Sequence, residues 1–133
     1  ERQAREASKV MTEKDLIHLY QFHETTWKNL TTFEVLRWDS FPWPLVKKPK
    51  TPEDITTSAI RAYLFSRVHP EKDSKSDKDR VKEQIKKWHP DRFELKYLPK
   101  VVEQDREKVK EGAGCVVRGL NDILTRVNAP SLF

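Results

Sequence analysis

R-V-K-E-Q-I-K-K-W-H-P-D-R-F, from Arg80 to Phe93, is the stretch around which this chain is organised, and its first part is a helix candidate. Its apolar residues recur at the spacing of one helix face; they are Val81, Ile85 and Trp88. Basic residues cover the remaining surface of the predicted helix, so one of its faces is positively charged and free. Pro90 cannot continue a helix and disfavours helical backbone in the residue before it, which predicts that the helix ends at Trp88.

A short polar motif follows this helix directly. His89, Pro90 and Asp91 come after Trp88, and Arg92 adds a further cation. Because proline restrains the backbone, we expect the tripeptide to form a tight and rigid loop. A rigid loop between two helices fits recognition of a partner better than acid-base catalysis by the histidine and the aspartate.

A basic helix that ends in His-Pro-Asp resembles helix II and the loop of a J-domain, the module by which Hsp70 co-chaperones engage Hsp70. With the upstream element F-P-W-P at 41–44, the chain is most similar to the J-like region of the NF-kappa-B inhibitor-like proteins and related fungal sequences. Val81 and Gln84 stand where a J-domain helix II carries Tyr and Leu, so the chain is J-like and not a standard J-domain. The partner-binding residues that this resemblance implies are His89, Pro90, Asp91, Arg80, Lys82, Lys86, Lys87 and Arg92.

The other helices predict an all-α fold, a J-domain-like antiparallel helical hairpin. Thr51 and Pro52 are typical of a helix start, and apolar spacing continues to Val68 as the equivalent of helix I. Ser76 is a predicted N-cap for the basic helix. Apolar residues from Val102 to Val127 indicate a long final helix, whose glycines we expect to face the basic helix. Residues 1–23 are predicted to form a further helix, with apolar positions that include Ala7, Val10 and Met11. Thr12 and Asp15 are the predicted cap of a restart within it.

Aromatic residues gather between these helices, in a segment that we call the aromatic strap (residues 38–44). It carries Trp38, Phe41 and Trp43, and its two prolines enforce extended backbone. Large aromatic side chains need a surface to cover them, so we expect the strap to pack onto the helices. The alternative is that the three residues form a binding hot spot for another protein. The predicted division is residues 1–50 as helix plus strap and 51–133 as the J-like domain.

Composition narrows the classes of function. The chain has 133 residues, which suits one core, and a single cysteine, which excludes an intrachain disulfide. No apolar run is long enough for a transmembrane helix. The net charge is +5, but acidic residues are interleaved with the basic ones, so a solvated surface is favoured over a nucleic-acid interface. No spacing matches a metal site, a phosphate-binding loop or a catalytic triad, and we expect neither a cofactor nor an enzyme.

Two functions from different classes follow from the resemblance. The first, which the intact His-Pro-Asp favours, is an Hsp70 co-chaperone that binds Hsp70 through the loop and the basic helix. The alternative is a non-catalytic scaffold of the NF-kappa-B inhibitor-like type in a nuclear RNA-processing or transcription-regulating assembly. In either case we expect a monomer in the nucleus or the cytoplasm.

Overall fold

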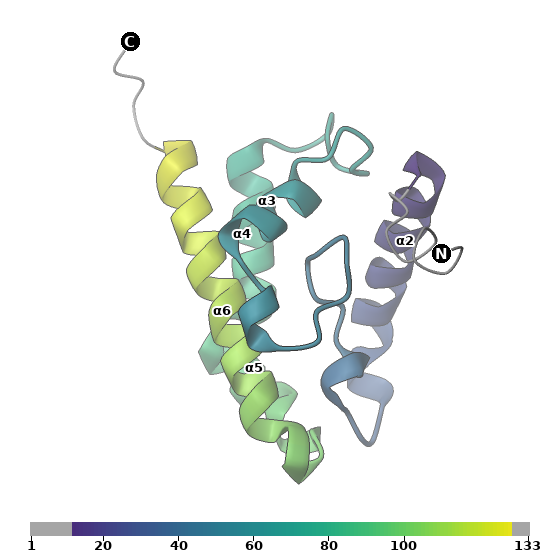
Figure 1. The fold of residues 1–133 in the computed structure, drawn as a ribbon, viewed down its shortest axis with the longest axis vertical. Coiled ribbons are helices and arrows are strands. Elements are labelled where there is room, and N and C mark those ends of the chain that lie inside the picture. Colours follow the sequence, from purple (N-terminus) through teal and green to yellow (C-terminus); the bar gives the residue numbers. More distant parts are fainter. Residues whose placement is uncertain (1–11, 129–133) are drawn as a thin grey trace, which may run out of the picture.

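The computed structural model of the protein describes residues 12–128. Within this range, β-type pairing is confined to one bridge between Leu36 and Val101. The α-helices are α2 (Glu13–Asn29), α3 (Thr57–Leu64), α4 (Asp77–Trp88), α5 (Pro90–Lys96) and α6 (Glu103–Asn128). The 3₁₀ turns are η1 (Leu30–Thr32), η2 (Trp38–Ser40), η3 (Pro52–Asp54) and η4 (Leu98–Lys100). The predicted all-α class is confirmed (Figure 1).

α4 and α6 form an antiparallel hairpin on one side of the fold, and α2 lies on the opposite side (Figure 1). The hydroxyl of Ser76 accepts a hydrogen bond from the Asp79 N–H, which confirms the predicted N-cap of α4. Between the two helices the chain forms α5 and η4. The hairpin buries one apolar face from each helix; its fully buried residues include Val81, Trp88, Val116 and Leu120.

α3 is shorter than the helix predicted from its flanking residues. The predicted start at Thr51 forms η3 instead, because the Asp54 carboxylate accepts hydrogen bonds from the N–H groups of Lys50 and Thr51 and closes a local turn. α3 begins after Thr56, whose hydroxyl caps it. It ends at Leu64, several residues before the predicted end at 68.

α2 begins where the sequence predicts a cap and runs further than predicted. Thr12 and Asp15 form a reciprocal capping box, as their spacing predicted. The helix continues to Asn29, past the predicted end at 23, and so brings the Trp27 ring against Trp88, with ring centroids 5.1 Å apart. The predicted apolar positions Ala7, Val10 and Met11 lie outside the described residues.

The aromatic strap packs into the hairpin. Trp43 stacks on Trp88 of α4 with ring centroids 4.9 Å apart, and Phe41 lies 5.2 Å from Phe93 of α5. Trp38, Phe41 and Trp43 are 4%, 4% and 2% exposed. Both strap indole N–H groups donate to backbone carbonyls, so their burial leaves no polar atom unsatisfied. The strap is therefore part of the core, and its residues are not available as a hot spot for a partner.

Two glycines of α6 are required by this packing. A Cβ at Gly112 would lie 2.7 Å from the Trp38 ring, and one at Gly119 would lie 2.6 Å from Cδ1 of Ile60 in α3. The absence of side chains at these glycines therefore leaves room for the strap and for α3. The sequence led us to expect the basic helix at these positions. This difference arises because the rings of Trp38 and Trp43 pack at Gly112 and the side chain of Ile60 packs at Gly119.

We expect opposite stability changes from two neighbouring glycine substitutions. Gly112→Ala forces its Cβ into the rigid Trp38 ring and should destabilise the protein by about 1–3 kcal/mol. Gly114→Ala meets only the flexible end of the Arg118 side chain, so it should stabilise the protein by up to about 1 kcal/mol through helix propensity. Urea unfolding of both variants measures the difference, and equal effects would contradict the tight strap–α6 contact.

Candidate functional site

The core holds the end of α4 in a fixed position. Trp88 is fully buried and stacks between the rings of Trp43 and Phe93, whose centroids lie 4.9 and 5.4 Å away. His89 follows at once and is exposed, and α5 begins at Pro90. Because an anchored side chain directly precedes it, His89 is presented to solvent from a rigid backbone.

His-Pro-Asp forms the start of α5 and not the predicted three-residue loop. The Nδ1 atom of His89 accepts a hydrogen bond from the Asp91 N–H at 3.2 Å, which makes the histidine the N-cap of α5. Pro90 and Asp91 then occupy the first turn, where proline and acidic residues are favoured. A neutral ring that accepts at Nδ1 carries its proton on Nε2, so this N–H is left to donate to a partner.

A second His-Pro-acid sequence in the chain shows that the hydrogen bond within the His89 motif depends on these three residues alone. His69-Pro70-Glu71 makes the same hydrogen bond, with the Glu71 N–H donating to Nδ1 of His69 at 3.1 Å. This copy does not end a helix, because α3 has already ended at Leu64. The hydrogen bond is thus a property of the His-Pro-acid sequence. The copy at His89 differs from it by its exposure and by the basic helix before it.

Exposed lysines form a stripe along α4 that ends near this motif. Lys78, Lys82 and Lys86 follow each other at intervals of four, and we call them the basic stripe. Among residues 12–128, no carboxylate lies within ion-pair distance of these lysines. Arg92 is exposed beyond His89. The sequence predicted Lys82, Lys86 and Arg92 as partner-binding residues and missed Lys78, which the interval of four could have found.

Two predicted members of the basic face do not lie on it. Arg80 is 5% exposed, and its guanidinium donates to the carbonyl of Leu64 at 2.7 Å. Lys87 is half-buried and turns toward α2, where its Nζ lies 5.4 Å from the centroid of the Trp27 ring. Positions 80 and 87 are seven residues apart and share a helix face, which packs against α3 and α2. We correct the predicted site accordingly.

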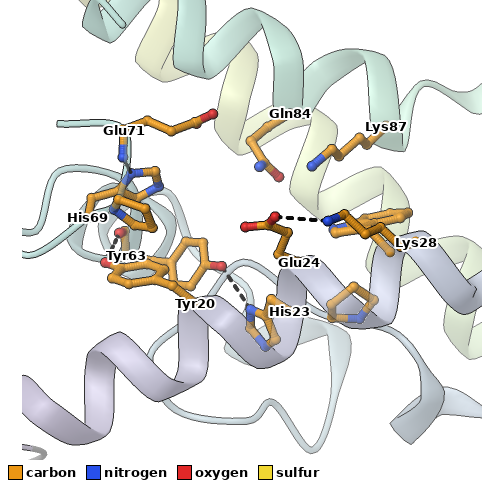
Figure 2. Close-up of a pocket in the computed structure, with 12 residues that line it drawn as sticks. Tyr20, His23, Glu24, Lys28, Tyr63, His69, Glu71, Gln84 and Lys87 are labelled. Carbon is orange, nitrogen blue, oxygen red and sulfur yellow. Dashed lines mark hydrogen bonds and ion pairs between the residues drawn. The ribbon is translucent and has the colours of Figure 1, made fainter. Parts of the chain in front are cut away.

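A cavity of about 400 Å³ lies between α2, the α3–α4 connection and α4 (Figure 2). Its wall is rich in rings; they belong to Tyr20, His23, Trp27, Tyr63 and His69. Gln84 and Lys87 reach into it from α4. No pattern in the sequence indicates this cavity, since its residues come from three distant segments without a shared period.

Hydrogen bonds connect tyrosine and histidine side chains of the cavity wall, and burial determines their charge state. Tyr20 donates to the carbonyl of Tyr63, and the Tyr63 hydroxyl lies 2.8 Å from Nδ1 of His23. Burial lowers the pKa of His23 to about 4 and that of His69 to about 4, and it raises the pKa of Tyr63. At neutral pH both histidines are therefore uncharged.

The family model of the NF-kappa-B inhibitor-like protein 1 C-terminal domain matches residues 58–128, just over half of the chain. The chain belongs to this family. No curated protein and no solved structure matches it. The part of the resemblance that concerns NF-kappa-B inhibitor-like proteins is thus confirmed.

The NF-kappa-B inhibitor-like match spans nearly all of α3 and the whole of α4, α5 and α6. The basic stripe and the His89 motif lie inside it, while α2 and the aromatic strap precede it. The cavity is consequently built in part by the family domain and in part by α2. In the part of the chain that the structure describes, no helix is long and apolar enough to cross a membrane, and no group of three metal-ligating side chains is found.

We expect the stability of this NF-kappa-B inhibitor-like chain to fall below about pH 6.5 through His23. Its pKa is about 4 in the folded protein and ~6.5 in the unfolded chain, so the unfolded state binds more protons between these values. By linkage, acidification to about pH 5 should remove ~2 kcal/mol of unfolding free energy. Urea unfolding across this range tests it. His23→Gln should remove the part of this pH dependence that His23 contributes and leave the part from His69, whose pKa burial lowers in the same way. Exposed His18→Gln should leave the profile unchanged, and an unchanged profile in His23→Gln would contradict the burial of a neutral His23.

Proposed function

We propose that this chain is a non-catalytic protein-interaction module of the NF-kappa-B inhibitor-like type, which acts in a nuclear assembly that processes RNA or regulates transcription. The observation that carries the proposal is the family match over residues 58–128, which covers the α4–α6 hairpin together with the His89 motif. In this proposal the chain works by binding proteins, and its localisation is nuclear.

The basic stripe and the His89 motif provide the binding surface for such a partner. Lys82 and Lys86 are exposed, and no described carboxylate pairs with them. Unpaired cations attract an acidic surface and accelerate the encounter. Trp88 holds the adjoining backbone, so the Nε2–H of His89 meets the partner without ordering a loop on binding. An acidic protein surface is therefore the proposed partner.

A pull-down from nuclear extract with charge-matched variants tests this proposal. The wild-type chain should enrich RNA-processing or transcription factors, and Lys82→Glu with Lys86→Glu should lose them. The control carries the same charge change on another surface, Lys47→Glu with Lys50→Glu, and should retain them. Absence of such factors, or equal loss in both double variants, would refute the proposal.

An Hsp70 co-chaperone is the second candidate, because His-Pro-Asp is exposed at the end of a basic helix within an antiparallel hairpin. It predicts that the chain stimulates ATP hydrolysis by an Hsp70. His89→Gln or Asp91→Asn should abolish the stimulation without unfolding the protein, whereas His18→Gln should preserve it. A wild-type chain that stimulates no Hsp70 would remove this candidate and leave the scaffold.

A further inference from the structure

The cavity between α2 and α4 contains a cation without a counter-ion. Lys28 pairs with Glu24 at 3.2 Å, and Glu71 pairs with Lys75 at 2.7 Å. Within residues 12–128, no carboxylate lies within ion-pair distance of Lys87. Lys75 is shared with Glu83, which it contacts at 2.8 Å, so the charges around the cavity balance. Lys87 is the ammonium group of the cavity wall that no described carboxylate contacts.

Two neutral donors face the cavity beside this ammonium. His69 accepts a hydrogen bond at Nδ1 and is uncharged, so its proton lies on Nε2, for which the described residues offer no acceptor. The carboxamide of Gln84 likewise makes no hydrogen bond to any described residue and reaches from α4 to the cavity beside Lys87 (Figure 2). Three donors thus converge from two opposite walls.

The rest of the wall suits an apolar group. The rings of Tyr20 and Tyr63 lie 4.9 Å apart on one side, and the Trp27 ring closes the other. With a volume of about 400 Å³ the cavity can admit a side chain or a chain end, but not a folded domain. An anion attached to an apolar or aromatic group would match both the donors and the rings.

We propose that this cavity binds a carboxylate of a peptide, next to an apolar or aromatic residue, through Lys87, His69 and Gln84. The site lies on the side of α4 that faces α2, so it is separate from the basic stripe and goes beyond the proposed function. Burial lowers the pKa of Lys87, which the nearest glutamates only partly offset, and an incoming carboxylate would relieve this cost. Charge-assisted hydrogen bonds are among the strong ones in proteins.

The proposal predicts that a substitution at Glu24 changes the affinity of the cavity for an anion. Its carboxylate lines the same cavity and is held by Lys28. A bound anion would be repelled by Glu24, so Glu24→Gln should strengthen binding. A merely hydrophobic cavity would not respond in this way.

The experiment titrates the full chain, labelled with ¹⁵N, with small peptides and follows its NMR shifts. N-acetylphenylalanine offers a chain-end carboxylate, N-acetylaspartylphenylalaninamide offers a side-chain carboxylate, and N-acetylphenylalaninamide is the uncharged control. We expect saturable shifts at Gln84, Lys87 and the Trp27 indole with at least one acid. The amide should bind at least about tenfold more weakly. The acid that binds more tightly identifies the source of the carboxylate.

Variants separate this binding from an effect on folding. Lys87→Met keeps the length of the side chain and should weaken binding of the acid about tenfold, whereas Lys47→Met on another exposed surface should not change it. Glu24→Gln should bind more tightly. The proposal is overturned if neither acid gives saturable shifts in the cavity at millimolar concentration, if the amide binds equally well, or if Lys47→Met weakens binding as much as Lys87→Met.

Discussion

A fragment that begins at Thr51 is expected to lose cooperative unfolding or to melt far below the full chain. It lacks the aromatic strap and α2, whose side chains cover Trp88, Phe93 and the first half of α6. Burial of one large side chain contributes about 1.5–3 kcal/mol, and the strap contributes three. Their loss would remove much of the ~5–15 kcal/mol by which a small domain is stable.

Trp43→Ala is the single-residue form of this prediction. The indole is 2% exposed, stacks on Trp88 and donates to the carbonyl of Trp38 at 2.9 Å. Its truncation leaves a cavity that the rigid neighbouring rings cannot fill, so the unfolding free energy should fall by about 3–5 kcal/mol. Phe22→Ala is the matched control, because Phe22 is 64% exposed on α2. Its effect should stay below about 0.5 kcal/mol.

Thermal unfolding of the fragment and urea unfolding of the two variants test whether the strap contributes to the stability of the core. A fragment that melts cooperatively near the temperature of the full chain would show that residues 51–133 form an independent domain. That outcome would support the predicted division at residue 50 as a domain boundary. The strap would then be an accessory layer despite its burial.

Features that depend on neighbouring residues were readable from the sequence. Ser76 and Thr12 cap their helices at the predicted positions, because capping needs only residues three apart in the chain. The end of α4 at Trp88 follows from the backbone restraint of Pro90. The burial of the strap follows equally from the need to cover its rings.

Features that depend on distant segments were not readable in this way. The apolar stripe of α4 is thin, so it does not specify which flanking residues turn toward α2 and α3. Arg80 and Lys87 were therefore placed on the solvent face, although one contacts Leu64 and the other Trp27. The cavity depends on the same unpredicted approach of α2, through Tyr20 and Tyr63.

Arg80 is expected to be the most important charged residue for stability. Its guanidinium donates to the carbonyl of Leu64, the last residue of α3, and pairs with Asp77. Its planar group also lies over the Phe65 ring, 5.2 Å from the centroid. The last carbonyls of a helix have no partner within it, so Arg80 satisfies one of them while joining α3 to α4.

Arg80→Ala should therefore lower the unfolding free energy by about 3 kcal/mol. Most of this comes from the Leu64 carbonyl, left buried without a donor at ~1–3 kcal/mol, and the rest from lost packing of the side-chain stem on Phe65. Asp77 contributes little, because its side chain is 59% exposed and water replaces its partner.

Arg80→Lys should recover only part of the loss, since an ammonium lacks the planar fork that spans two acceptors. Lys82→Ala on the exposed face of the same helix should change stability by less than about 0.5 kcal/mol. Urea unfolding of the three variants measures these differences. An Arg80→Ala protein as stable as Lys82→Ala would show that Arg80 lies on the solvent face of α4.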